Sequence, residues 1–155
     1  MKPEFTALQR EQLDDQLRPL RRARLSAPRA GWVRAIRDAL GMNGRQFSDR
    51  MRISRTNLGK LEDSEVRGVV SMETLRRAAE ALGCDLIYAL VPRDGKTLDM
   101  LVQERALEVA KAQVDRVAST MELEDQAVSR EFRKRETDRV AVELVRTMSR
   151  DLWNE

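Results

Sequence analysis

The sequence contains no histidine and only one cysteine, Cys84. One cysteine cannot form a disulfide within the chain, and a zinc site of the usual kind needs a cluster of Cys and His. Without imidazole, the chain also lacks the commonest general base and activator of nucleophiles near neutral pH. We therefore expect no metal, no cofactor and no enzymatic activity, although carboxylate or lysine chemistry stays open in principle.

The sequence also lacks a long hydrophobic run. Its longest purely apolar stretch, residues 86–91, is far shorter than the ~20 residues that a helix needs to span a bilayer. Residues 1–5 lack the apolar stretch of a signal peptide. We therefore expect a cytoplasmic protein and no membrane partner.

Acidic residues are scarce in one part of the chain, although the formal net charge is only +3. Residues 18–60 hold 12 Lys and Arg against 2 Asp and Glu, whereas residues 61–155 hold 15 against 20. A basic segment suits a polyphosphate such as DNA, and an acidic segment suits a different partner. The alternative is a solvated charged surface that binds nothing.

Apolar residues recur at helical spacing through the first half of the chain. Residues 4–25 are amphipathic, and Pro19 is expected to kink this helix or to start a new segment, because proline has no N–H to donate. Four more helices are expected between residues 30 and 82, and in the first of them Trp32, Val33, Ile36 and Leu40 share one apolar face. Three of them have a residue that favours an N-cap: Asn43, Ser54 and Ser71.

Residues 85–91 read as a β-strand with apolar side chains on both faces. A lone strand cannot satisfy its own backbone N–H and C=O groups. We therefore expect this strand to pair with its copy across a homodimer. A long helix is expected at residues 97–118, and a capping box at Ser119 and Glu122 would begin a last helix at about 121–152.

The most informative pattern lies in residues 42–62, where two short helices meet at a three-residue turn. Apolar residues are spaced to pack these helices together: Phe47, Met51, Ile53, Leu58 and Leu61. Short or cationic side chains stay on the open face of the second helix: Arg55, Thr56, Asn57 and Lys60. Such groups can donate hydrogen bonds to guanine, adenine or phosphate. Spacing alone leaves open a plain helical hairpin with a polar exterior.

The motifs in this region are Ile36-Arg-Asp-Ala-Leu-Gly-Met42, Phe47-Ser48, Ile53-Ser-Arg-Thr-Asn-Leu58 and Leu61-Glu62. With them, residues 30–82 resemble the phage-repressor helix-turn-helix of the XRE (Cro/C1) type. The resemblance implies that Arg55, Thr56 and Lys60 touch base edges. It also implies that Arg45 lies near a backbone phosphate.

Three residues depart from the pattern of that family. Gly44 stands where a phosphate-binding glutamine is common, Ser48 where a small alanine is usual, and Arg52 where the turn has glycine. Arg45 or Gln46 would have to supply the phosphate contact, and the conformation of the turn is left open. We assign DNA contact to Arg45, Gln46, Ser54, Arg55, Thr56, Asn57 and Lys60.

A narrower resemblance spans nearly the whole chain. Its motifs are residues 17–22, Gly31-Trp32 with Ile36-Arg37, and residues 74–84, 86–92 and 120–126. Together they resemble the bacterial mobile mystery protein A family, whose members are encoded beside a Fic-domain protein. Fic proteins typically transfer AMP from ATP to a hydroxyl of a target. The resemblance therefore implies an antitoxin-like role: binding the Fic partner and repressing the shared operon.

One local pattern bears on that role. Fic inhibitors often carry Ser or Thr, three other residues, then Glu followed by Gly or Asn, and the glutamate competes for the arginine that would hold the γ-phosphate of ATP. Thr120 and Glu124 have this spacing, but Asp125 follows. A match of this kind is expected about once by chance in such a chain. Thr120 as a simple cap of the last helix is the alternative.

These observations predict a mainly α protein: a phage-repressor-like helix-turn-helix bundle, one dimer-forming β-strand and a C-terminal two-helix module. We expect an N-terminal helical arm (1–28), a DNA-binding domain (29–93) and a partner-binding or dimerisation module (94–155). The predicted function is repression of a palindromic operator by a homodimer that is also the antitoxin of a Fic-type toxin. The alternatives are a stand-alone XRE-family regulator and an inhibitory module that has lost DNA binding.

Overall fold

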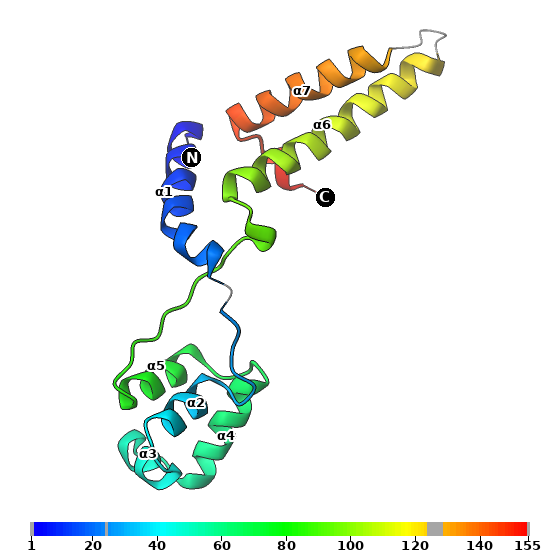
Figure 1. The fold of residues 1–155 in the computed structure, drawn as a ribbon. Coiled ribbons are helices and arrows are strands. Elements are labelled where there is room, and N and C mark those ends of the chain that lie inside the picture. Colours follow the sequence, from blue (N-terminus) through cyan, green and yellow to red (C-terminus); the bar gives the residue numbers. More distant parts are fainter. Residues whose placement is uncertain (1, 24, 124–128, 155) are drawn as a thin grey trace. The chain divides into compact units, whose positions relative to one another are not determined.

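The computed structural model describes residues 2–23, 25–123 and 129–154 (Figure 1). The chain divides into two compact units. We call residues 24–89 the central unit, and residues 1–23 with 90–155 the terminal unit, because both ends of the chain belong to it. The described residues contain no helix that is long and apolar enough to cross a membrane.

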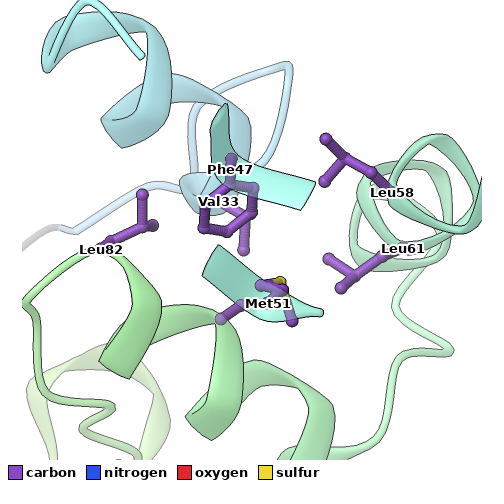
Figure 2. Close-up of a cluster of buried hydrophobic side chains, with 7 residues drawn as sticks. Val33, Phe47, Met51, Leu58, Leu61 and Leu82 are labelled. Atoms are coloured by element: carbon purple, nitrogen blue, oxygen red, sulfur yellow. The ribbon is translucent and has the colours of Figure 1, made fainter. Parts of the chain in front are cut away.

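The central unit consists of short helices around one buried aromatic ring. These helices are α2 (Trp32–Ala39), α3 (Gly44–Met51), α4 (Arg55–Val66) and α5 (Met72–Ala81). Phe47 is fully buried and is surrounded by Val33, Met51, Leu58, Leu61, Ala78 and Leu82 (Figure 2). The side chains of Asn43, Ser54 and Ser71 accept backbone N–H groups and cap α3, α4 and α5. The four helices and three caps predicted from the sequence are confirmed.

The terminal unit joins the N-terminal helix to the C-terminal ones. Helix α1 (Pro3–Arg22) contacts α6 (Leu98–Leu123), and α6 runs beside α7 (Arg130–Thr147) as an antiparallel hairpin (Figure 1). Two 3-10 turns, η1 (Arg93–Gly95) and η2 (Arg150–Trp153), flank these helices. Small buried residues let α6 and α7 approach closely: Ala106, Ala110 and Ala141. Leu152 of η2 is fully buried in the same core.

A buried carboxylate fastens α1 to α6. Asp14 Oδ1 accepts the N–H of Leu98 at 2.8 Å, and Oδ2 accepts the N–H of Asp99 at 3.2 Å. The Nη1 of Arg21 lies 3.1 Å from Asp14 Oδ1, and the two side chains are only 11% and 12% exposed. Asp14 therefore caps a helix that begins 84 residues later in the chain.

The strand predicted at residues 85–91 is not formed, and the described residues contain no strand at all. The apolar side chains of Ile87, Tyr88 and Leu90 are 82%, 72% and 89% exposed. The prediction was wrong for the single chain because a strand needs a neighbouring backbone to pair with. Within the described ranges no other segment supplies that backbone.

The C-terminal helices begin and end at other residues than predicted. Helix α6 continues through Ser119, so that serine starts no new helix. Helix α7 begins after Ser129, whose Oγ accepts the N–H of Phe132 at 3.2 Å. Helix α1 runs through Pro19 without ending there. The three parts predicted from the sequence stay a prediction, because they divide the chain by role rather than by packing.

Candidate nucleic-acid interface

A tight turn sets the direction of α4 relative to α3. Arg52 adopts a left-handed conformation with φ 54° and ψ 46°. The N–H groups of Arg52 and Ile53 donate to the carbonyl oxygens of Asp49 and Ser48 at 3.2 and 3.0 Å. A conformation that glycine adopts most readily is thus held here by an arginine. The turn therefore forms without the usual glycine.

Two of the predicted DNA-contacting residues cap helices. The Oε1 of Gln46 accepts the N–H of Asn43 at 2.8 Å, and the N–H of Gln46 donates to Asn43 Oδ1 at 2.9 Å. These two bonds form a capping box. The Oγ of Ser54 accepts the N–H of Asn57 at 3.1 Å. Both caps fix the first turns of α3 and α4, the ends at which backbone N–H groups can meet a phosphate.

The structure accounts for the departure at position 48 and leaves the one at position 44 without a packing reason. Ser48 is 2% exposed, and its hydroxyl donates to the carbonyl oxygen of Gly44 at 2.7 Å. The hydroxyl is therefore satisfied inside α3, so serine fits where alanine is usual. A Cβ added at Gly44 would lie 3.6 Å from Leu58 Cδ2, which is ordinary van der Waals contact. Space therefore does not require glycine at position 44.

A buried ion pair that the sequence did not indicate holds α4 against α2. Arg37 is 8% exposed, and its Nε lies 2.9 Å from Glu62 Oε1. Its Nη1 also donates to the carbonyl oxygen of Met42 at 3.0 Å. One guanidinium thus joins α2, the loop before α3, and α4. Both residues were part of the repressor-like motif, and this shared motif was the only signal that could have revealed their role.

The remaining predicted contact residues point into solvent. Arg45 lies in the first turn of α3, and Arg55, Thr56, Asn57 and Lys60 lie on α4. All five residues are exposed. Among the described residues their side chains form no hydrogen bond or ion pair. The structure therefore places four donor side chains on the exposed surface of one helix, where no described residue occupies them.

Of the two residues predicted to inhibit a Fic partner, the structure describes only Thr120. Thr120 lies inside α6, and its hydroxyl donates to the carbonyl oxygen of Arg116 at 3.2 Å. The alternative, in which Thr120 caps the last helix, is therefore wrong, because Ser129 caps that helix. Glu124 lies outside the described residues.

Comparison with known protein families assigns the central unit. Residues 33–88 match a helix-turn-helix family model, HTH_3. The match runs from the second residue of α2 through α5, and it includes the turn at Arg52 and the exposed residues of α4. The chain therefore contains a helix-turn-helix domain of the XRE type, a class of DNA-binding regulators. No curated protein and no solved structure matches the chain.

Proposed function

We propose that this chain is a transcriptional repressor that binds a palindromic operator as a homodimer, with one half-site for each subunit. The observation that carries the proposal is the exposed surface of α4 in a helix-turn-helix domain, where four donor side chains have no partner among the described residues. The buried pair of Arg37 and Glu62 supports it, because that pair holds α4 in place before any DNA is bound.

Affinity and specificity would come from different residues. In the proposed complex α4 lies in the major groove, where Arg55, Thr56, Asn57 and Lys60 read base edges. Arg45 at the start of α3 meets a backbone phosphate, with the N-terminal turns of α3 and α4 beside it. Cations that meet phosphates release counterions, so affinity falls steeply as the salt concentration rises.

The test is a fluorescence-anisotropy titration of the full chain against the DNA upstream of its own gene, at two salt concentrations. We expect Arg55→Ala/Lys60→Ala to lose at least about tenfold in operator affinity. The matched control is Lys134→Ala/Arg135→Ala, which removes the same two charges from exposed positions of α7. The control should keep its affinity if α4 reads the operator.

Weak binding of every DNA sequence, equal for wild type and for both variants, would contradict the repressor proposal. The chain would then be an inhibitory protein whose helix-turn-helix no longer reads DNA.

We propose as a second function that the chain is the antitoxin of a Fic-type, AMP-transferring protein. Its support is the resemblance of segments along nearly the whole chain to a family that is encoded beside such proteins. The excess of acidic residues in 61–155 fits a protein partner. We expect the chain to co-purify with that Fic-domain protein and to suppress its AMP transfer. Absence of a complex would leave a stand-alone XRE-family regulator.

Thr120 and Glu124 are the residues proposed to inhibit the Fic partner. If Glu124 competes for the arginine that binds ATP, Glu124→Gln should restore AMP transfer while the complex still forms. Suppression that is unchanged in Glu124→Gln would assign the inhibition to other residues.

A further inference from the structure

The hairpin of α6 and α7 leaves an apolar groove open to solvent. A hairpin of two helices has two faces, and each needs a further element to cover it. One face of this hairpin has a groove of roughly 600 Å³. Small side chains form the floor of the groove: Ala106 from α6 and Ala141 from α7. Leu107 and Val142 stand at its sides, and they are 45% and 68% exposed. These two side chains therefore offer apolar area to a second surface.

The charges in the groove are placed symmetrically around Val142. Asp138 lies four residues before it and Arg146 four residues after it, and both line the groove. On a helix these positions lie on the same side, one turn away in each direction, about 6 Å along the axis. The groove therefore presents a negative end, an apolar centre and a positive end.

We infer that this groove binds the same groove of a second copy of the chain, with the two α7 helices antiparallel across a twofold axis at Val142. In a twofold interface residue i of one copy meets residue j of the other, and j meets i. The axis at Val142 brings Asp138 of each copy opposite Arg146 of the other. Two identical ion pairs then flank a central contact between the two Val142 side chains.

The local contacts leave both charged groups able to make these pairs. Asp138 is exposed and has no hydrogen bond or ion pair among the described residues. Arg146 binds Glu143 through Nε and Nη2, at 2.8 and 2.6 Å, and its Nη1 has no partner among the described residues. A partner of another kind would not need charges that mirror each other about one valine. This symmetry is what favours a second copy.

The inference rests on the proposed repressor function in one respect, because a palindromic operator calls for two subunits. It replaces the pairing of strands at residues 85–91, which the single chain does not form, by pairing of helices in the terminal unit. Dimerisation would then lie in a different unit from the residues that read DNA.

The first test exchanges the two charges in the full chain. Sedimentation velocity should give wild type twice the 17.8 kDa mass of the chain. Asp138→Arg and Arg146→Asp should each weaken the dimer at least tenfold, because like charges then face each other. The double variant Asp138→Arg/Arg146→Asp should dimerise again. Circular dichroism checks that each variant keeps its helices.

The second test places a charge on the proposed axis. Val142→Lys should yield monomers, since two ammonium groups would meet at the centre of the interface. Val117→Lys is the matched control, because Val117 is 58% exposed on α6 but lies outside this groove. The control should remain dimeric.

Three outcomes would overturn the inference: a monomeric wild type at high micromolar concentration, a dimer that survives Val142→Lys, or folded single variants that the double variant does not rescue. Operator binding separates this failure from failure of the repressor proposal. A monomer that still binds a half-site specifically overturns only the dimer interface. A dimer that binds no DNA specifically overturns only the repressor.

Discussion

Arg52 holds the left-handed turn between α3 and α4 with φ 54°. A residue with a Cβ is disfavoured in this region by roughly 1–2 kcal/mol, whereas glycine adopts it freely at some cost in chain entropy. We therefore expect Arg52→Gly to stabilise the central unit by about 0.5–1 kcal/mol. Arg52→Ala is the control, because it removes the same side chain but keeps the Cβ. It should give no such gain.

The measurement uses a tryptophan as the reporter of a single unit. Trp32 belongs to the central unit and Trp153 to the terminal unit. In a Trp153→Phe background, urea unfolding followed by fluorescence therefore reports on the central unit alone. A lower midpoint for Arg52→Gly than for the parent would show that the arginine side chain contributes more than its backbone conformation costs.

Breaking the buried pair of Arg37 and Glu62 should change the stability of the central unit more than Arg52→Gly does. Their side chains are 10% and 12% exposed, and removing one partner of such a pair leaves an unpaired buried charge. We expect Arg37→Met to destabilise the central unit by about 3 kcal/mol. The double variant Arg37→Met/Glu62→Leu should recover much of this loss, since no charge is then left unpaired. Urea unfolding followed by Trp32 fluorescence, in the Trp153→Phe background, measures the stability of the single and the double variant.

Arg34 provides the control for Arg37 on the same helix. Its ion pair with Asp38, at 3.8 Å, has both side chains 56% exposed. Exposed pairs contribute little, so Arg34→Met should change stability by less than about 0.5 kcal/mol. Equal losses for Arg34→Met and Arg37→Met would contradict a special role for the buried pair.

At the scale of the helix, Asp14 fixes the start of α6 from a distant point of the sequence. Asp14→Ala removes two hydrogen bonds from a charged acceptor and leaves Arg21 unpaired. We expect a loss of about 2–3 kcal/mol in the terminal unit. The readout is Trp153 fluorescence in a Trp32→Phe background.

The neighbour Asp15 is the matched control for Asp14. It pairs with Arg18 within α1, and the side chains of Asp15 and Arg18 are 60% and 67% exposed. Asp15→Ala should therefore change stability by less than about 0.5 kcal/mol. A loss equal to that of Asp14→Ala would contradict a special role for the bonds from Asp14 to the start of α6.

Helix α7 carries an exposed pair whose titration has a definite sign. The hydrogen bond from Arg139 lowers the pKa of Glu136 below its ordinary value, and the charge of Arg139 adds to this effect. A pKa lowered by folding contributes stability above the unfolded pKa, and that contribution is lost as the pH falls through the folded pKa. We expect Arg139→Gln to return the pKa of Glu136 to its ordinary range, measured by NMR titration. An unchanged pKa of Glu136 in this variant would show that Arg139 is not the cause of the lowered value.

The sequence predicted the central unit well because its signals are local. Capping residues and apolar spacing decide where α3, α4 and α5 begin. Within α2 the prediction was only partly right. Val33 is buried, but Trp32 and Leu40 of the expected apolar face are 44% and 57% exposed, while Arg37 is buried. Periodicity treats arginine as polar and cannot foresee that a distant glutamate will neutralise it.

The terminal unit was harder to predict because its determinants lie far apart in the sequence. Asp14 and Leu98 are 84 residues apart, so no local pattern in the sequence connects them. The apolar run at 85–91 had the composition of a strand, yet a strand also needs a partner backbone. Ser119 and Glu122 had the spacing of a capping box. However, α6 continues through Ser119, so this spacing did not mark the start of a helix. In the candidate site, the exposure of Arg55, Thr56, Asn57 and Lys60 was correctly expected from spacing.

At the scale of the whole molecule, the two units have separate cores that share no residue. We therefore expect the two tryptophan reporters to follow two distinct urea transitions, one for each unit. Arg37→Met should move only the Trp32 transition, and Asp14→Ala only the Trp153 transition. A single transition, shared by both reporters and moved by both variants, would mean that the units fold as one cooperative body.

Ligands that bind only the folded state should act on these transitions selectively. A ligand at 100 times its dissociation constant stabilises its binding unit by about 2.7 kcal/mol. Operator DNA should therefore raise the Trp32 transition, because the proposed contact residues lie in the central unit. A higher protein concentration should raise the Trp153 transition, because the proposed dimer interface lies in the terminal unit. If DNA moves neither transition, the operator proposal fails. If protein concentration moves only the Trp32 transition, two copies associate through the central unit and the helical groove is not their interface.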